Sequence, residues 1–233
     1  MHVGGTEMKL EAVVDTATGE KVHCAVIDNN NKRSAFVLTL ENFINAINSG
    51  ITNTDADVAS MPKLELPEGY VTGWTNQPYN EISGFSGVVI LNTPAECRLM
   101  SFDKSAYIVP FPELVFKLQL SNGKLIKDRC YAKKGNQLYA YPYTNVYDDG
   151  HICWGSCELP FVKSIKETEK IPQLFLRFTG NSDLSNSVTL AAAGCREMKD
   201  VLKKLEGKDT FPREWLQSVN INYDDLISTS CIE

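Results

Sequence analysis

The residues best suited to chemistry lie in one short stretch, YTNVYDDGHICWGS, which covers residues 143–156. It contains Cys153, eight positions after Asn145 and directly before Trp154. The Asp-Asp-Gly sequence at 148–150 predicts a tight turn, because Asp favours turns and Gly accepts a positive φ. A thiol between this turn and Trp-Gly-Ser is poorly placed for the middle of a strand. We therefore expect Cys153 on an irregular surface segment, where reacting side chains are common.

The chain has seven cysteines, an odd number at scattered positions. In a cytosolic protein this pattern favours free thiols over a disulfide framework. Most free cysteines are small, buried and unreactive, and this remains the alternative for Cys153. A free thiol, with a pKa of about 8.5, is only a few per cent thiolate at pH 7, yet it is a strong nucleophile. Cys153 is therefore the candidate catalytic residue.

His151, Cys153 and Cys157 form an H-x-C-x3-C pattern that could bind zinc. Structural zinc sites usually have four ligands in paired clusters, and the sequence has no second cluster, since only His2 and His23 remain. A serine-hydrolase elbow and a phosphate-binding glycine loop are absent as well. We expect no metal and no other cofactor, with a metal-binding adaptor as the alternative.

Composition and charge exclude several classes of function. The chain has 233 residues, of which 43% are hydrophobic and 22% charged, as in an ordinary globular protein. Its net charge of -6 argues against binding duplex nucleic acid through the phosphates. No apolar run is long enough for a bilayer, and residues 1–15 lack the pattern of a signal peptide. The prediction is a cytoplasmic protein without nucleic-acid or membrane partners.

Hydrophobic periodicity predicts a strand hairpin and then a helix near the N-terminus. Residues 8–30 alternate between apolar and polar around Thr18-Gly19. A helix is expected from an N-cap at Thr39 to a stop at Gly50. Residues 50–86 are rich in proline and glycine, which indicates a long connection with one or two short strands.

The middle of the chain reads as consecutive strands, and the last part reads as helical. The strand segments are VVILN, CRLMSF, AYIVPF, LVFKLQL, LIKDRCYA and LYAYP. Their short connections predict an antiparallel meander. Residues 188–207 have the spacing of one helix, which is preceded by a loop with a short helix. Strands followed by helices predict the α+β class, with a small hairpin and helix extension at 1–80 and a core at 81–233.

Asn145, Val146, Gly150, Ile152 and Cys153 fall in register with a known signature. Ubiquitin-conjugating enzymes carry His-Pro-Asn-(Val/Ile)-x3-Gly-x-(Val/Ile)-Cys-Leu around their active thiol. The segment PFPELVFKL also resembles the strand and proline-rich loop that precede this motif. The resemblance implies a ubiquitin-conjugating-like fold, in which an antiparallel meander is followed by the active-site loop and C-terminal helices.

The wider sequence resembles more closely still a bacterial branch of this family, protein B of the PRTRC systems. The similarity covers residues 86–180 and rests on VVILNTPAECRLMSF, PFPELVFKL, YPYTNVYDDGHICWGS and PQLFLRFTG. Tyr143 and Thr144 replace the His-Pro of the eukaryotic signature. Because that His mainly holds the active-site loop, the change affects loop geometry more than chemistry. Trp154 replaces Leu, and its ring would shield one side of the site and could contact the tail of the modifier.

The resemblance implies a relay of thioesters. An activating enzyme of the ThiF type would pass the C-terminus of a ubiquitin-like modifier to Cys153, and an amine such as lysine would then attack. A JAB-type peptidase would belong to the same system. Exchange between thiols needs orientation more than a lowered pKa. In the family the signature Asn donates to the oxyanion, at about 3 kcal/mol for a good donor; Asn145 matches it, with local backbone bonding as the alternative.

Other residues of the stretch have more than one possible role. His151 lies two positions before Cys153, so in extended backbone both side chains point the same way. Histidine titrates near neutral pH, which makes His151 a candidate general base, although the family does not use this position. Asp148 and Asp149 could help an incoming amine to lose its proton, or only form the turn. A non-catalytic relative that binds partners through the same face is the competing function.

Overall fold

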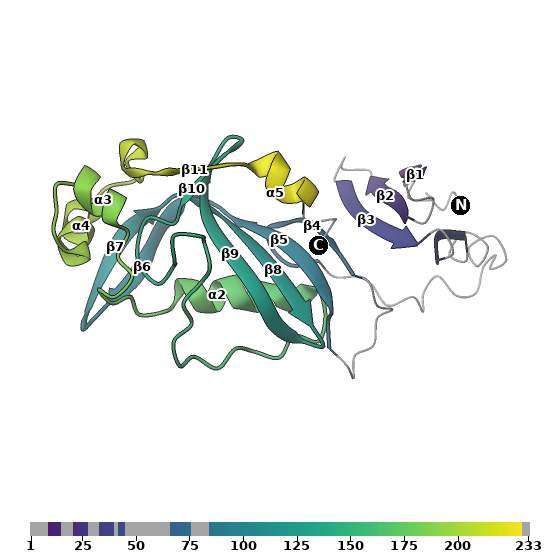
Figure 1. Cartoon of the computed structure of the whole chain (residues 1–233), viewed down its shortest axis with the longest axis horizontal. Helices are drawn as coiled ribbons and strands as arrows, with labels where there is room; N and C mark the ends of the chain where they lie inside the picture. The colour runs from purple at the N-terminus through teal and green to yellow at the C-terminus, as the bar shows by residue number, and fades with distance from the viewer. Residues whose placement is uncertain are drawn as a thin grey trace, which may run out of the picture. The chain divides into compact units, whose positions relative to one another are not determined.

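The structure is a computed structural model that describes residues 9–14, 21–27, 33–39, 42–44, 66–75 and 84–229. The chain divides into two compact units, Met1–Leu64 and Glu65–Glu233. Figure 1 shows the course of each. None of the helices in these described ranges is long and apolar enough to cross a membrane.

The smaller unit contains a three-stranded antiparallel sheet in the order β1-β2-β3. Its strands are Lys9–Val14, Lys21–Ile27 and Arg33–Thr39. The hairpin predicted around Thr18-Gly19 is confirmed, since Leu10 of β1 lies opposite Val26 of β2. Val22 and Cys24 of the central strand are buried.

The helix predicted from Thr39 to Gly50 is described only over residues 42–44, which are helical. The hydroxyl of Thr39 accepts a hydrogen bond from the amide of Asn42 at 3.1 Å, as an N-cap does. The rest of the predicted range lies outside the described residues.

The larger unit is built on a six-stranded antiparallel sheet in the order β11-β10-β9-β8-β5-β4. Its strands are Tyr70–Trp74 (β4), Gly87–Thr93 (β5), Glu113–Ser121 (β8), Lys124–Lys134 (β9), Gln137–Ala140 (β10) and Ser218–Asn222 (β11). Leu114, Phe116 and Leu118 of β8 are fully buried. Helix α2 (Lys170–Leu176), which follows the 3-10 helix η1 (Lys166–Glu169), packs on this side, with Phe175 edge-on to Phe116 at 5.9 Å (Figure 1).

The simple meander that we predicted is wrong at one place. Strands β6 (Glu96–Phe102) and β7 (Ser105–Phe111) pair with each other in a separate two-stranded sheet. Strand β5 therefore pairs with β8 across this inserted hairpin. Pro94 and Pro112 flank the hairpin, and proline ends a ladder because it has no amide hydrogen.

The single helix predicted at 188–207 is two helices, α3 (Ser187–Ala192) and α4 (Met198–Leu205). Gly194, with a φ of 62°, ends the first. The apolar face expected on the second is confirmed, because Met198, Val201, Leu202 and Leu205 are buried in the main core.

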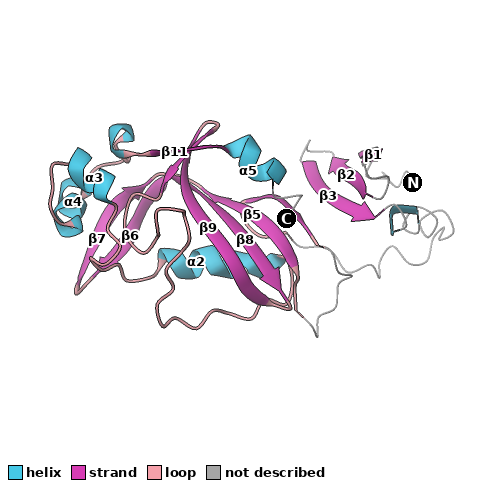
Figure 2. Cartoon of the chain, viewed as in Figure 1, coloured by secondary structure: helices cyan, strands magenta, loops and turns pink. Residues whose placement is uncertain are grey.

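The last part of the chain contains a strand that the sequence did not reveal. After the short 3-10 helix η2 (Arg213–Trp215), β11 adds to the sheet beside β10, and helix α5 (Tyr223–Thr229) follows (Figure 2). The sequence of β11, SVNIN, alternates polar and apolar residues, but it contains only two apolar side chains, Val219 and Ile221, and a pattern this short does not distinguish a strand from a loop.

The α+β class and the antiparallel sheet are confirmed, whereas the specific ubiquitin-conjugating topology stays a prediction. We expected the core to begin at residue 81, but β4 is already a strand of its sheet. The functional division into 1–80 and 81–233 also stays a prediction.

Candidate active site

The stretch with the candidate thiol lies in the loop between β10 and η1, and backbone hydrogen bonds fold it back on itself. Val146 and Ile152 form an isolated antiparallel bridge. Within it, the amide of Tyr147 donates to the carbonyl of His151 at 2.9 Å, and the amide of Gly150 donates to the carbonyl of Tyr147 at 2.9 Å. Gly150 has a φ of 88°, so the glycine of the predicted turn is in the left-handed region.

This fold brings the backbones of Asn145 and Cys153 together. Asn145 has a φ of 67°, and its carbonyl accepts a hydrogen bond from the amide of Cys153 at 2.8 Å. Its side-chain nitrogen donates to the carbonyl of Thr179 at 3.3 Å. The side chain of Asn145 therefore bonds to backbone, but to a residue 34 positions away and not within its own turn, so the alternative of local backbone bonding is not what this contact shows. Because a carboxamide has two N–H donors, the second is left for another acceptor.

Cys153 is a free thiol with a half-buried side chain. The hydroxyl of Tyr147 donates a hydrogen bond to its sulfur at 3.7 Å, and this bond raises the pKa of the Tyr147 phenol. Cys130 differs, since it is fully buried and burial raises the pKa of its thiol well above the ordinary value. Buried apolar surroundings make a thiol inert, so the two cysteines have distinct environments.

A buried carboxylate, Asp128 of β9, holds the loop in place. Its side chain is only 2% exposed. The amide of Ile152 donates to Oδ1 at 2.8 Å and the indole nitrogen of Trp154 donates to Oδ2 at 2.8 Å. Nδ1 of His151 lies 2.9 Å from Oδ1. Since a carboxylate only accepts, Nδ1 carries the proton that points to Asp128.

Asp128 was missed in the sequence analysis, although a signal for it exists. Side chains alternate between the two faces of a strand, and Asp128 shares the core-facing side of β9 with Cys130 and Ala132. A buried acid must be paired or hydrogen-bonded. An acid at an apolar position of a strand therefore indicates donors elsewhere in the chain.

The ring of His151 connects Asp128 with Tyr147. It stacks on the Tyr147 ring with centroids 6.0 Å apart and planes 15° apart. Tyr147, which is 46% exposed, was also missed. The period-two rule for extended backbone does not place it beside the thiol, because Asn145, with a φ of 67°, interrupts the extended segment before it.

The two aspartates of the turn are exposed and differ in their contacts. The carboxylate of Asp149 accepts from the amide of His151 at 3.0 Å and lies 3.2 Å from the guanidinium of Arg129. Its carbonyl accepts from the hydroxyl of Tyr131 at 3.0 Å. These contacts fit turn formation. The contacts within the described residues give Asp148 no comparable role.

Tyr143 and Thr144, which replace His-Pro, are buried at 1% and 2% exposure. The hydroxyl of Tyr143 donates to the carbonyl of Pro110 at 2.7 Å, and its ring lies 4.9 Å from that of Phe111. Thr144 packs against Gly180, where an added Cβ would come within 2.6 Å of Oγ1. Tyr143 thus anchors the start of the loop to β7.

The side chain of Trp154 packs against the main hydrophobic core. Besides its bond to Asp128, its ring lies edge-on to Phe175 at 6.0 Å and to Phe178 at 6.2 Å. It therefore ties the loop to α2. The expected contact with the tail of a modifier stays a prediction.

The zinc pattern is not assembled. Within the described residues, no three His, Cys, Asp or Glu side chains are grouped to hold an ion, and this includes His151, Cys153 and Cys157.

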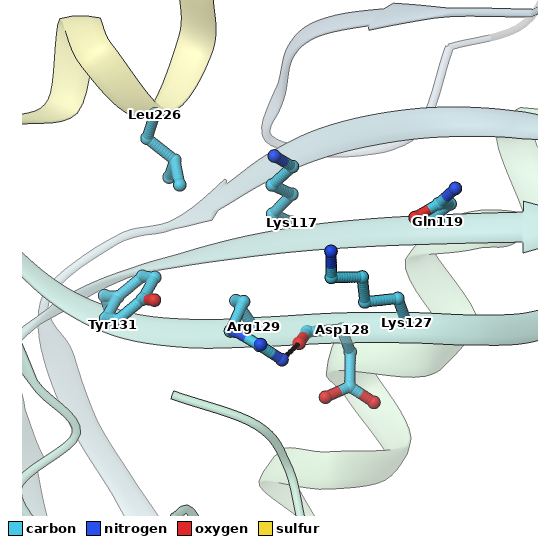
Figure 3. A pocket seen from close by; sticks show the side chains of 7 residues that line it. All are labelled: Lys117, Gln119, Lys127, Asp128, Arg129, Tyr131 and Leu226. Carbon is cyan, nitrogen blue, oxygen red and sulfur yellow. Dashed lines mark hydrogen bonds between the residues drawn. The ribbon is translucent and has the colours of Figure 1, made fainter. Parts of the chain in front are cut away.

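A separate pocket of about 190 Å³ opens on strands β8 and β9. It is lined by Lys117, Gln119, Lys127, Asp128, Arg129, Tyr131 and Leu226. Figure 3 shows Lys117 and Lys127 on one side of the strands and the carboxylate of Asp128 on the other. The pocket borders the Asp149 turn through Arg129 and Tyr131, but Cys153 does not line it.

A model of a known protein family, prokaryotic E2 family D, matches residues 72–219. The matched range contains every residue of the site described above. Neither the curated proteins nor the solved structures gave a match.

Proposed function

The chain belongs to prokaryotic E2 family D, and on this premise we propose that it is a conjugating enzyme that carries a ubiquitin-like modifier as a thioester on Cys153. The family indicates a conjugating-enzyme-like role with protein partners. One observation carries the catalytic proposal. Cys153 is a half-buried free thiol whose amide is bonded to Asn145 at 2.8 Å, on a loop that Asp128 fixes to the sheet.

The proposed reaction has two steps. The sulfur of Cys153, which has lost its proton to solvent, attacks the thioester carbonyl carbon of the incoming modifier. The new C–S bond forms as the old one breaks, and the donor sulfur leaves with the electron pair as a thiolate, which takes up a proton from solvent. An amine, such as that of a lysine, then attacks the same carbon. The C–N bond forms, the bond to Cys153 breaks, and the amine releases a proton to solvent.

Both steps place negative charge on the carbonyl oxygen, and Asn145 is the proposed donor to it. A fixed amide donor can contribute about 3 kcal/mol to such a transition state. The bond from its nitrogen to the carbonyl of Thr179 orients the carboxamide, which supports this role.

The proposed partners follow from the resemblance to protein B of the PRTRC systems. An activating enzyme of the ThiF type would load the modifier, and a JAB-type peptidase would remove it from its acceptor. We propose a cytoplasmic site of action for this relay.

A synthetic peptide that ends in a glycyl thioester tests the reaction without knowledge of the natural modifier. The native chain should gain one acyl group by intact mass, and a reducing thiol or hydroxylamine should remove it. Cys153→Ala should gain none. Cys157→Ala is the matched control, because Cys157 is a second half-buried thiol of the same loop, and it should react like the native chain. Equal acylation of Cys153→Ala would overturn the proposal in favour of a binding module.

A further inference from the structure

We propose that Tyr147 is a catalytic residue that donates a hydrogen bond to the sulfur of Cys153 while that sulfur is negatively charged. This inference rests on the proposed function. Tyr147 and Cys153 lie on opposite sides of the Gly150 turn, in the two arms of the loop that the Val146–Ile152 bridge joins. The hydroxyl of Tyr147 lies 3.7 Å from Sγ of Cys153.

The phenol is suited to the donor role. An ordinary tyrosine, with a pKa of about 10, keeps its proton at neutral pH, and the bond to Cys153 is the largest cause that raises the pKa of Tyr147 further. Its neighbour Asn145 directs a side-chain N–H to Thr179. In the proposed reaction Tyr147 would donate to the sulfur, and the second N–H of Asn145 would donate to the carbonyl oxygen of the modifier.

The ring of His151 and the carboxylate of Asp128 hold the Tyr147 phenol in position. His151 stacks on it at 6.0 Å, and Nδ1 of His151 lies 2.9 Å from the buried carboxylate of Asp128. We assign His151 and Asp128 as positioning residues, because they act through Tyr147 and through the loop.

A hydrogen bond to sulfur affects the two steps unequally. In the loading step the sulfur attacks, and a hydrogen-bond donor withdraws electron density from it, so the donor brings no gain to this step. In the aminolysis step the sulfur leaves with the electron pair of the C–S bond, and stabilisation of the departing thiolate only helps. Loss of the hydroxyl should therefore slow aminolysis more than loading.

The test compares Tyr147→Phe with the native chain, with the glycyl peptide thioester for loading and free lysine for aminolysis. We expect aminolysis to slow by ~10-fold and loading to change by less than ~3-fold. Tyr223→Phe is the matched control, since its hydroxyl bonds to Asn92 on β5, and it should match the native chain in both steps. A purely structural role would slow both steps of Tyr147→Phe alike, and that result, or unchanged rates, would overturn the proposal.

Two His151 variants separate positioning from proton transfer. His151→Ala removes the stacked ring and should slow aminolysis, whereas His151→Phe keeps a ring and should restore most of the rate. Equal loss in both variants would overturn the role of the stacked ring in holding the phenol. If the native chain is not acylated at all, the proposed function fails together with this inference, whereas acylation with an unaltered Tyr147→Phe removes the inference alone.

Discussion

The carbonyl of Asn145 accepts a hydrogen bond from the amide of Cys153 at 2.8 Å. The two signature residues are thus joined by backbone across the hairpin, and the left-handed φ of 67° at Asn145 makes this possible. Geometry at position 145 and the chemistry of its side chain are therefore separate functions that substitutions can distinguish.

Asn145→Gly should keep the geometry and remove the carboxamide, because glycine accepts a positive φ without strain. We expect thermal unfolding close to that of the native chain and acyl transfer from the glycyl thioester slowed by ~10²-fold, the typical cost of one lost oxyanion donor. Asn145→Ala adds backbone strain of about 1 kcal/mol and should also unfold at lower temperature. Native rates in Asn145→Gly would show that the carboxamide serves only the loop.

Asp128→Ala should destabilise the loop at residues 143–156. It leaves the amide of Ile152 and the indole N–H of Trp154 without their acceptor, at about 1–3 kcal/mol for each buried donor. We expect the free energy of unfolding, measured in urea, to fall by about 3 kcal/mol, with a red shift of tryptophan emission. Asp148→Ala, an exposed acid of the same loop, should remain within about 0.5 kcal/mol of the native chain. A native-like Asp128→Ala would contradict the anchoring role.

Gly150 and Gly155 permit a separation of backbone strain from steric clash. Both have positive φ, 88° and 55°, but an added Cβ meets the Tyr131 ring at 2.7 Å only at Gly150, whereas Gly155 has nothing within 4 Å. Gly155→Ala should cost about 1 kcal/mol, and Gly150→Ala about 1–3 kcal/mol more, because the rigid ring must move. Urea unfolding of both variants measures the difference. Equal losses would mean that the Gly150 turn adapts without strain.

Much of the site was predictable because it is local in sequence. The Asp-Asp-Gly turn and the eight-residue separation of Asn145 from Cys153 reflect a single hairpin, and the strand segments reflect period-two alternation. Two residues that hold the loop or contact the thiol, Asp128 and Tyr147, were not predicted. Asp128 acts through a contact between β9 and a loop 24 residues later, and the orientation of Tyr147 depends on a ring that Asp128 fixes.

The errors in the predicted fold also arise from contacts between residues that are distant in sequence. Alternation identifies strands but not their partners, so the β6–β7 hairpin was placed in the main sheet rather than in a sheet of its own. Helical spacing continues across Gly194, whose φ of 62° ends α3, so two helices looked like one. Both outcomes depend on tertiary pairing rather than on local pattern.

Tyr143→Phe should destabilise the chain without loss of chemistry per folded molecule. It removes the buried hydroxyl that donates to Pro110 at 2.7 Å, at about 1–2 kcal/mol. Because 1 kcal/mol shifts Tm by roughly 2–4 °C in a chain of this size, we expect a fall of about 4 °C by calorimetry. Tyr147→Phe, at an exposed position, should leave Tm nearly unchanged. A larger fall in Tm for Tyr147→Phe than for Tyr143→Phe would contradict the structural role of Tyr143 and the catalytic role of Tyr147.

Cys153→Ala should lower the pKa of the Tyr147 phenol. In the native chain the hydrogen bond to Cys153 is the main cause that raises this pKa, and the charge of the thiolate acts in the same direction. Removal of the sulfur removes both causes, so the phenol should ionise at lower pH, closer to an ordinary tyrosine at about 10. The Cζ chemical shift of ¹³C-labelled tyrosine, followed against pH and assigned with Tyr147→Phe, measures this change. Cys157→Ala should leave the titration of Tyr147 as it is in the native chain, and an unchanged titration in Cys153→Ala would mean that the phenol does not bond to that sulfur in solution.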